Sequence, residues 1–142
     1  MPQMNWGYAD VLTTADRHAF FKIMLRSVAE AEGLRVTFMP KPFPGKAGTG
    51  AHVHLSAWGA PGTPRAGQNL FSDPSGELGL SADAYAFIGG VLDSAEGLAA
   101  ITNPTVNSYK RINAPVTASG ATWSPNTVSY TGNNRTHSAC LG

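Results

Sequence analysis

Two histidines separated by one residue are the first feature of this sequence that could do chemistry. His52 and His54 lie in residues 51–58, where apolar and polar residues alternate, and Ser56 continues the polar side. This alternation predicts a β-strand, which would place both imidazoles on one face about 6.5–7 Å apart. One imidazole could then bind a metal ion while the other contacts a neighbouring ligand.

The same pair also fits two half-exposed strand histidines that bind nothing. A zinc site needs three or four ligands. The other histidines, His18 and His137, are distant in the sequence, and the single cysteine is Cys140. A metal bound by His52 would therefore need ligands from elsewhere.

A glycine-rich run, residues 45–50, precedes the histidines. Such a run lets backbone groups approach a ligand closely, and Lys41 and Lys46 add positive charge for an anion. A Walker phosphate loop opens a helix, whereas these glycines precede a predicted strand. A plain surface turn is the alternative interpretation.

Two arginines follow side-chain amides. Arg111 ends the polar run 103–111, and Arg135 follows Asn134. A guanidinium in this setting can be aimed at a carboxylate or a phosphate. Each arginine taken alone also fits a solvated surface residue.

The elements that must position these residues are predicted from periodicity and from turn residues. A helix is expected over 13–32, beginning with a capping pair at Thr13 and Asp16 and ending at Gly33. A second helix is expected from Ser81 to about Ile101. In both helices an apolar stripe repeats at helical spacing. The first stripe is Phe20, Met24, Val28 and Ala31, widened by Phe21 and Leu25, and the second is Tyr85, Ile88, Leu92, Ala95 and Ala99.

The rest of the chain is predicted as strands, turns and loops. Strands are expected at 35–39 and 51–58 and as short pieces after Arg111, with a turn at 73–76 and a loop at 103–111. The sequence therefore predicts an α+β fold.

Composition narrows the class of protein. The 142 residues fit one domain or part of a larger one, since roughly 100–200 residues form a domain. A net charge of +1 with 13% charged residues disfavours nucleic acid and membrane surfaces as partners. One cysteine and no apolar run of about 18 residues lead us to expect a soluble, cytoplasmic protein.

Three strings carry a resemblance to a known family. Residues 38–42 (FMPKP), 48–56 (GTGAHVHLS) and 103–111 (NPTVNSYKR) occur in an order and at a spacing that resemble glutamine synthetase. The resemblance runs from about residue 5 to residue 139. Within it, RINAPV, SGATWSPNT and TGNNRTH are most similar to the branch that includes γ-glutamylmethylamide synthetases, the glutamate–methylamine ligases.

The resemblance implies an ATP-dependent ligase that also uses Mg²⁺ or Mn²⁺. ATP phosphorylates the glutamate side chain, and ammonia or a small amine such as methylamine then displaces phosphate from γ-glutamyl phosphate. Cations are needed because negative charge develops on the transferring phosphoryl group. The implied roles are His52 for the metal, His54 and Ser56 for ATP, Ala47, Gly48 and Arg111 for glutamate, and Arg135 between the ATP phosphates and the substrate.

The resemblance also implies an architecture and an assembly. An antiparallel sheet would line the active site, with helices packed on its outer face. Residues 1–142 would be a partial catalytic domain, without the N-terminal β-grasp domain and the C-terminal part, of a homo-oligomer built as stacked rings.

Departures from the family pattern lead us to expect that the segment alone is inactive. Met4, Asn5 and Trp6 follow Gln3 where the family has a metal-binding glutamate, Asn113 stands where many relatives have a glutamate, and Cys140 stands where relatives have an arginine. Two alternatives are a non-catalytic nucleotide-binding or interaction remnant of such an enzyme, and an unrelated cupin-like metal enzyme using His52 and His54.

Overall fold

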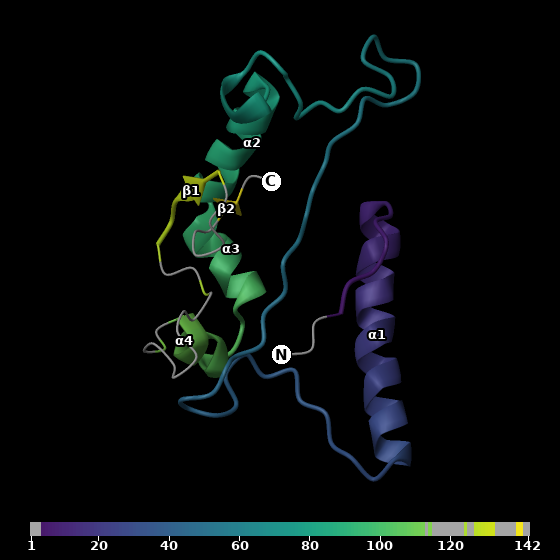
Figure 1. The fold of residues 1–142 in the computed structure, drawn as a ribbon, viewed down its shortest axis with the longest axis vertical. Helices are drawn as coiled ribbons and strands as arrows, with labels where there is room; N and C mark the ends of the chain where they lie inside the picture. The colour runs from purple at the N-terminus through teal and green to yellow at the C-terminus, as the bar shows by residue number, and fades with distance from the viewer. Residues whose placement is uncertain (1–3, 113, 115–123, 125–126, 133–138, 141–142) are drawn as a thin grey trace. The chain divides into compact units, whose positions relative to one another are not determined.

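The computed structural model describes residues 4–112, 114, 124, 127–132 and 139–140 (Figure 1). The chain divides into two compact units, Met1–Met39 and Pro40–Gly142.

Helix α1, Val11–Ala31, dominates the first unit (Figure 1). Asp10 caps its start, because Oδ1 accepts a hydrogen bond from the backbone N–H of Thr13 at 3.0 Å. At its end, Gly33 with φ +69° and Leu34 donate to carbonyls of the last turn, at 3.0 and 2.7 Å. The predicted helix is confirmed, but it begins two residues before Thr13 because Asp10 supplies the cap.

The packed face of α1 is only part of the predicted stripe. Phe21 contacts Trp6 and Phe38, with ring centroids 5.7 and 6.1 Å apart. Phe20 and Val28 of the predicted stripe are 66% and 56% exposed. Phe21, which widens the predicted stripe, is therefore confirmed as a packed position, whereas Phe20 and Val28 are not, because the segments before and after the helix supply the packing partners. The strand expected at 35–39 is also absent, although Phe38 packs on the helix.

The second unit begins with irregular chain. Residues 50–57 form no strand, and isolated β-bridges join Trp58 to Asn69 and Gly59 to Ala66. The strand expected over 51–58 is therefore not formed, because a strand needs a neighbouring segment to pair its backbone groups along its length.

A turn and a capping residue lead into the next helices, as expected. Asp73 Oδ1 accepts from the backbone N–H and the hydroxyl of Ser75 at 2.9 and 2.7 Å, which closes the turn at 73–76. A short 3-10 helix, η1 (Glu77–Gly79), follows. Ser81 Oγ then accepts from the backbone N–H of Ala84 and caps α2, Ala82–Asp93.

The predicted helix from Ser81 to Ile101 is two helices, α2 and α3 (Ala95–Thr102). The Ser94 hydroxyl donates to the Gly90 carbonyl at 2.7 Å, and a serine bonded back in this way bends a helix. Among the described residues no single helix is long and apolar enough to cross a membrane. Within that part of the chain, only α2 and α3 taken together, bent by 72° at their junction, have the length and apolar composition of a membrane span.

The loop expected at 103–111 is wrong for most of that range, because residues Val106–Ile112 form helix α4. Thr105 precedes it, and its hydroxyl accepts from the backbone N–H of Ser108 at 3.3 Å. Ser108 is buried, at 3% exposed. The capping threonine was the local signal that this polar run contains a helix.

The described residues contain one small sheet. Strand β1, Tyr130–Thr131, pairs in parallel with β2, Ala139–Cys140, so that Tyr130 lies opposite Ala139. Tyr130 also packs on Tyr85 of α2, with ring centroids 6.4 Å apart. Helices are thus confirmed, whereas the expected antiparallel sheet is not confirmed in the part of the chain that the structure describes.

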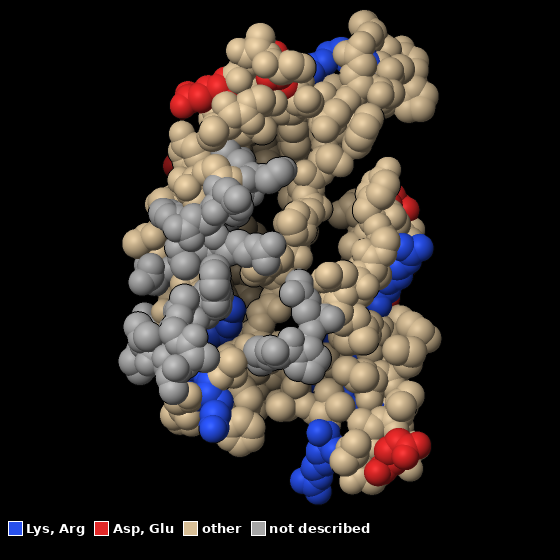
Figure 2. Space-filling model, viewed as in Figure 1, with Lys and Arg blue, Asp and Glu red and all other residues tan. Residues whose placement is uncertain are grey.

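Charged side chains are sparse on the visible surface. On the face shown in Figure 2, the Lys and Arg side chains and the Asp and Glu side chains form small separate groups among uncharged residues. This agrees with the charged fraction of 13%.

Candidate functional site

Asn107 on α4 holds the segment that leads into the glycine-rich run. Its Oδ1 accepts from the backbone N–H of Lys41 at 2.5 Å, and its Nδ2 donates to the carbonyl of the same residue at 2.8 Å. One side-chain amide therefore satisfies both backbone groups of a residue 66 positions away. This link places α4 beside the segment that leads into the glycine-rich run.

The side chain of Lys41 also binds within the loop that contains the glycine-rich run. Its side chain is buried, and Nζ donates to the carbonyl of Lys46 at 2.5 Å. The backbone N–H of Thr49 donates to the carbonyl of Pro40 at 2.8 Å. Residues 40–49 therefore form a loop closed by internal hydrogen bonds.

Arg111, one helical turn after Asn107, lies against this loop. A Cβ atom added to Gly50 would lie 2.6 Å from Arg111 Nη2 and 2.9 Å from Cζ. A Cβ added to Gly48 would lie 3.2 Å from Arg111 Cδ and 2.6 Å from the carbonyl oxygen of Pro40. The arginine can come this close to the backbone because both residues lack a side chain.

The electrostatics of Arg111 follow from its burial. Partial removal from water lowers the pKa of its guanidinium below the ordinary value. Arginine still remains protonated in proteins, so the group is a half-buried cation. Its Nη1 donates to Ser124 Oγ at 3.4 Å. A planar cation with paired N–H donors suits a carboxylate or a phosphate.

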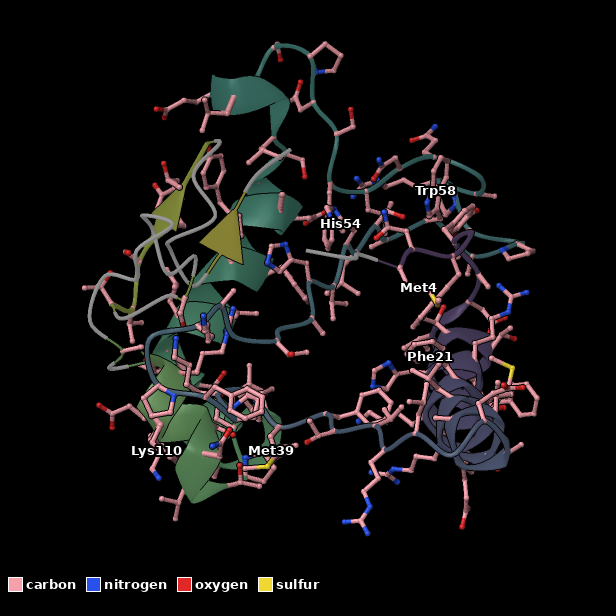
Figure 3. All side chains as sticks on the ribbon, turned by 60° about the horizontal axis from the view of Figure 1, so that its bottom comes forward. Met4, Phe21, Met39, His54, Trp58 and Lys110 are labelled. Carbon is pink, nitrogen blue, oxygen red and sulfur yellow. The ribbon has the colours of Figure 1, made fainter. Side chains whose placement is uncertain are left out.

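Three residues predicted to bind metal or ATP, His52, His54 and Ser56, lie on the irregular chain before Trp58, where Figure 3 labels His54. His52, His54 and Ser56 are exposed. Ser56 Oγ accepts from Trp58 Nε1 at 2.9 Å. Because no strand forms there, the expected same-face arrangement of the two imidazoles is not established.

The donor side chains among the described residues do not fit a divalent metal ion. Among the described residues, no group of three or more His, Cys, Asp or Glu side chains lies together. His52 is the single metal ligand predicted in this segment, and Mg²⁺ takes mostly oxygen ligands. The described side chains therefore do not make a metal site by themselves.

Other predicted residues have different outcomes. Ala47 is exposed in the closed loop, next to Gly48. Arg135 and Asn113 lie outside the described residues, and Cys140 is described only as backbone of β2. The structure thus brings the loop of Ala47 and Gly48 together with Arg111.

Sequence reasoning missed two residues of this arrangement, Asn107 and Gly50. Asn107 lies four positions before Arg111, a spacing that puts both on one helical face. That signal becomes visible only when residues 106–112 are recognised as a helix. A surface pocket at the end of α1 contains none of the predicted site residues; it is lined by Arg26, Glu30, Gly33, Leu34, Arg35 and Val36.

Comparison with known proteins gives consistent matches along the chain. Residues 3–140 match the family model described as glutamine synthetase, catalytic domain. A glutamine synthetase of Rhizobium leguminosarum bv. phaseoli is 62% identical over 135 residues, which are 95% of this chain and 30% of that protein. A glutamine synthetase of Thermus thermophilus is 41% identical over 133 residues, covering 94% of this chain and 27% of that protein.

A relative with a different name also matches. The glutamate–methylamine ligase of Methyloversatilis universalis is 41% identical over 135 residues, covering 94% of this chain and 29% of that protein. The chain therefore spans about 30% of the length of these curated relatives.

Proposed function

This chain belongs to the glutamine synthetase catalytic-domain family, and from this membership we propose that it forms the glutamate-binding part of an ATP-dependent ligase. The observation that carries the proposal is the half-buried Arg111 guanidinium held against Gly48 and Gly50. The reaction joins glutamate to ammonia or a small amine as a γ-glutamyl amide. The segment acts as part of a larger active site.

Arg111 binds a carboxylate of glutamate in this proposal. Its N–H groups can donate in parallel to two carboxylate oxygens, and partial burial reduces the competition from water. A carboxylate bound there would lie beside the loop, where Ala47 and Gly48 offer backbone groups to the rest of the substrate. These contacts orient glutamate for attack of its side-chain carboxylate on ATP.

The chemistry proceeds in two steps. An oxygen of the side-chain carboxylate attacks the terminal phosphorus of ATP, forming γ-glutamyl phosphate and releasing ADP. The amine nitrogen then attacks the acyl carbon, the carbon–oxygen bond to phosphate breaks, and the amine loses a proton. Activation makes the leaving group phosphate rather than hydroxide.

ATP and a divalent metal belong to the proposal as cofactors. We assign His54 and Ser56 to ATP, His52 to Mg²⁺ or Mn²⁺, and Arg135 to the space between the ATP phosphates and the substrate. A bound cation would neutralise charge on the transferring phosphoryl group. Because His52 is a single ligand, the remaining metal ligands would have to come from other parts of the active site.

The proposed amine is ammonia, with methylamine as the second candidate. The 62% identical relative is named glutamine synthetase, and the relative named for methylamine is 41% identical. We also propose a cytoplasmic location, as expected from the single cysteine, and a stacked-ring homo-oligomer, which the family resemblance implies.

A segment exchange tests this function directly. The matched part of the Rhizobium leguminosarum glutamine synthetase is replaced by this chain's residues, and ADP release is followed with glutamate, ATP and either amine. We expect glutamate-dependent ADP release that is faster with ammonia than with methylamine. An exchanged protein that assembles and binds ATP without turnover would favour the nucleotide-binding remnant instead.

Arg111→Lys in the exchanged protein tests the central residue. Loss of paired hydrogen bonding to a carboxylate should lower kcat/KM for glutamate about 100-fold, since charged hydrogen bonds contribute roughly 1.5–3 kcal/mol. Arg65→Lys is the matched control, because Arg65 is exposed and pairs with Asp83 at 2.6 Å. An unchanged glutamate KM and kcat in Arg111→Lys would refute the assignment.

A further inference from the structure

The two-point hydrogen bonding of Asn107 to Lys41 is more than a local contact. A single amide that accepts from the N–H and donates to the C=O of one residue imitates a neighbouring strand. It therefore restricts both the position and the direction of the chain at Lys41. Both residues are at least partly shielded from water, and Lys41 is only 7% exposed.

Because Lys41 is also hydrogen-bonded to the glycine-rich run, restricting Lys41 restricts that run as well. Its Nζ donates to the carbonyl of Lys46, on the far side of the loop. Breaking this bond would leave a buried ammonium group without that partner, which is costly. The carbonyl of Pro40, adjacent to Lys41, accepts from Thr49, between the two glycines that face Arg111.

The same hydrogen bonds of Asn107 also restrict Arg111, because both residues lie on α4. The two residues are four positions apart on α4, so they lie on one face of the helix, one turn from each other. Fixing Asn107 on Lys41 sets the rotation of α4. That rotation decides whether the Arg111 guanidinium lies at Gly50 or turns away from it.

We propose that Lys41 and Asn107 are positioning residues that hold the Arg111 guanidinium against the glycine-rich run. Neither residue contacts the substrate. The effect of this positioning on glutamate binding rests on the proposed function, whereas the positioning of Arg111 itself does not.

Nuclear magnetic resonance of the ¹⁵N-labelled chain tests both parts. Without ligand, the nuclear Overhauser contact between the Arg111 side chain and the Gly50 α-protons reports positioning. With L-glutamate as the probe, the shifts of the Arg111 Nε–H and of the Gly48 and Gly50 amides give Kd. A separate titration with ATP shows whether any change is specific to glutamate.

Lys41→Met and Asn107→Leu are the test variants. Both should lose the contact between Arg111 and Gly50, and their Kd for glutamate should rise about tenfold, the size expected for one or two lost hydrogen bonds. Binding of ATP should change less than twofold, because His54 and Ser56 make none of these bonds. Unchanged signals of Ala84 and Ile88, both buried in α2, verify that the unit remains folded.

Matched controls separate positioning from loss of charge or of an amide. Lys110→Met removes a positive charge next to Arg111 on α4, where Figure 3 labels the exposed Lys110. Asn103→Leu removes an amide that donates only to neighbouring Thr102 in the described contacts. Both controls should keep the contact and change Kd less than twofold.

The outcomes distinguish the inference from the proposed function. Test variants that keep both the contact and the glutamate Kd would overturn the positioning role, and so would controls that lose them equally. No saturable glutamate binding by the unsubstituted chain, or equal binding by Arg111→Lys, would overturn the glutamate site. The ligand-free contact would then still support or refute positioning by Lys41 and Asn107.

Discussion

Gly50 shows at the scale of one residue how the candidate site depends on the absence of a side chain. The space that its Cβ would take is occupied by the end of Arg111, with Nη2 at 2.6 Å. A real Cβ atom cannot come that close, so the guanidinium would have to move. The length and flexibility of the Arg111 side chain allow it to move without unfolding the loop. A side chain at Gly50 should therefore weaken binding at Arg111 more than it destabilises the fold.

Gly50→Ala should therefore weaken glutamate binding while the chain stays folded. We expect the Kd for glutamate to rise about tenfold, since a displaced guanidinium loses at least one charged hydrogen bond. Gly97→Ala is the matched control, because an added Cβ there meets nothing within 4 Å. It should leave Kd unchanged and stabilise α3 by about 0.5–1 kcal/mol. Equal Kd values for the two variants, measured by calorimetry, would contradict the prediction.

At the scale of elements, the start of α1 should respond to pH. Hydrogen bonds from the side chain and the backbone of Thr13 hold the pKa of the Asp10 carboxyl below its ordinary value. A carboxyl group with a lowered folded pKa stabilises the fold fully above its unfolded value. This contribution is lost as pH falls through the lower, folded value.

Circular dichroism between neutral pH and pH about 2 measures the expected loss of helix. The loss should occur mainly below the pKa of the unfolded carboxyl, which is near 3.9. Asp10→Asn keeps a capping side chain that does not titrate, so its helix signal should vary less with acid. Asp16→Asn, inside α1, should retain the response of the cap. Identical acid profiles for Asp10→Asn and the unsubstituted chain would show that the cap does not cause the pH dependence.

Helix α4 depends on its cap because it has only seven residues. Such a short helix is marginal without tertiary contacts. Thr105 accepts from the backbone N–H of Ser108, and removing a cap of this kind costs about 1 kcal/mol. Thr105→Ala should therefore speed hydrogen exchange of the α4 amides about fivefold, whereas Thr105→Ser should preserve their protection. Equal exchange in both variants would exclude this role for the cap.

At the scale of the whole molecule, binding and catalysis should separate. The proposal assigns glutamate to Arg111 and the loop at Gly48, but gives a metal only His52 in this segment. Mg²⁺ requires several oxygen ligands. The 142-residue chain alone should bind glutamate but release no ADP from ATP with Mg²⁺, glutamate and ammonia. Coupled-assay turnover by the isolated chain would contradict this, and the exchanged protein is the positive control.

Local patterns determined much of the secondary structure in advance. Gly33 ends α1 with a positive φ, Ser81 caps α2, and the turn at Asp73 forms as expected. Each of these features depends on hydrogen bonds or dihedral angles within a few residues. The family, too, followed from strings of residues without any coordinates, and residues 3–140 match its catalytic-domain model.

Contacts between distant residues required the tertiary structure. The sequence alone indicated a helix from Ser81 to Ile101 and a strand over 51–58, but the hydroxyl of Ser94 and the lack of a pairing segment changed both. By resemblance, Gly48 and Arg111 were expected to share a substrate, whereas only the structure showed Arg111 against Gly50 and Asn107 bonded to Lys41. Periodicity records which residues share a face of their own element. The partner of that face is decided by packing between segments that lie far apart in the chain.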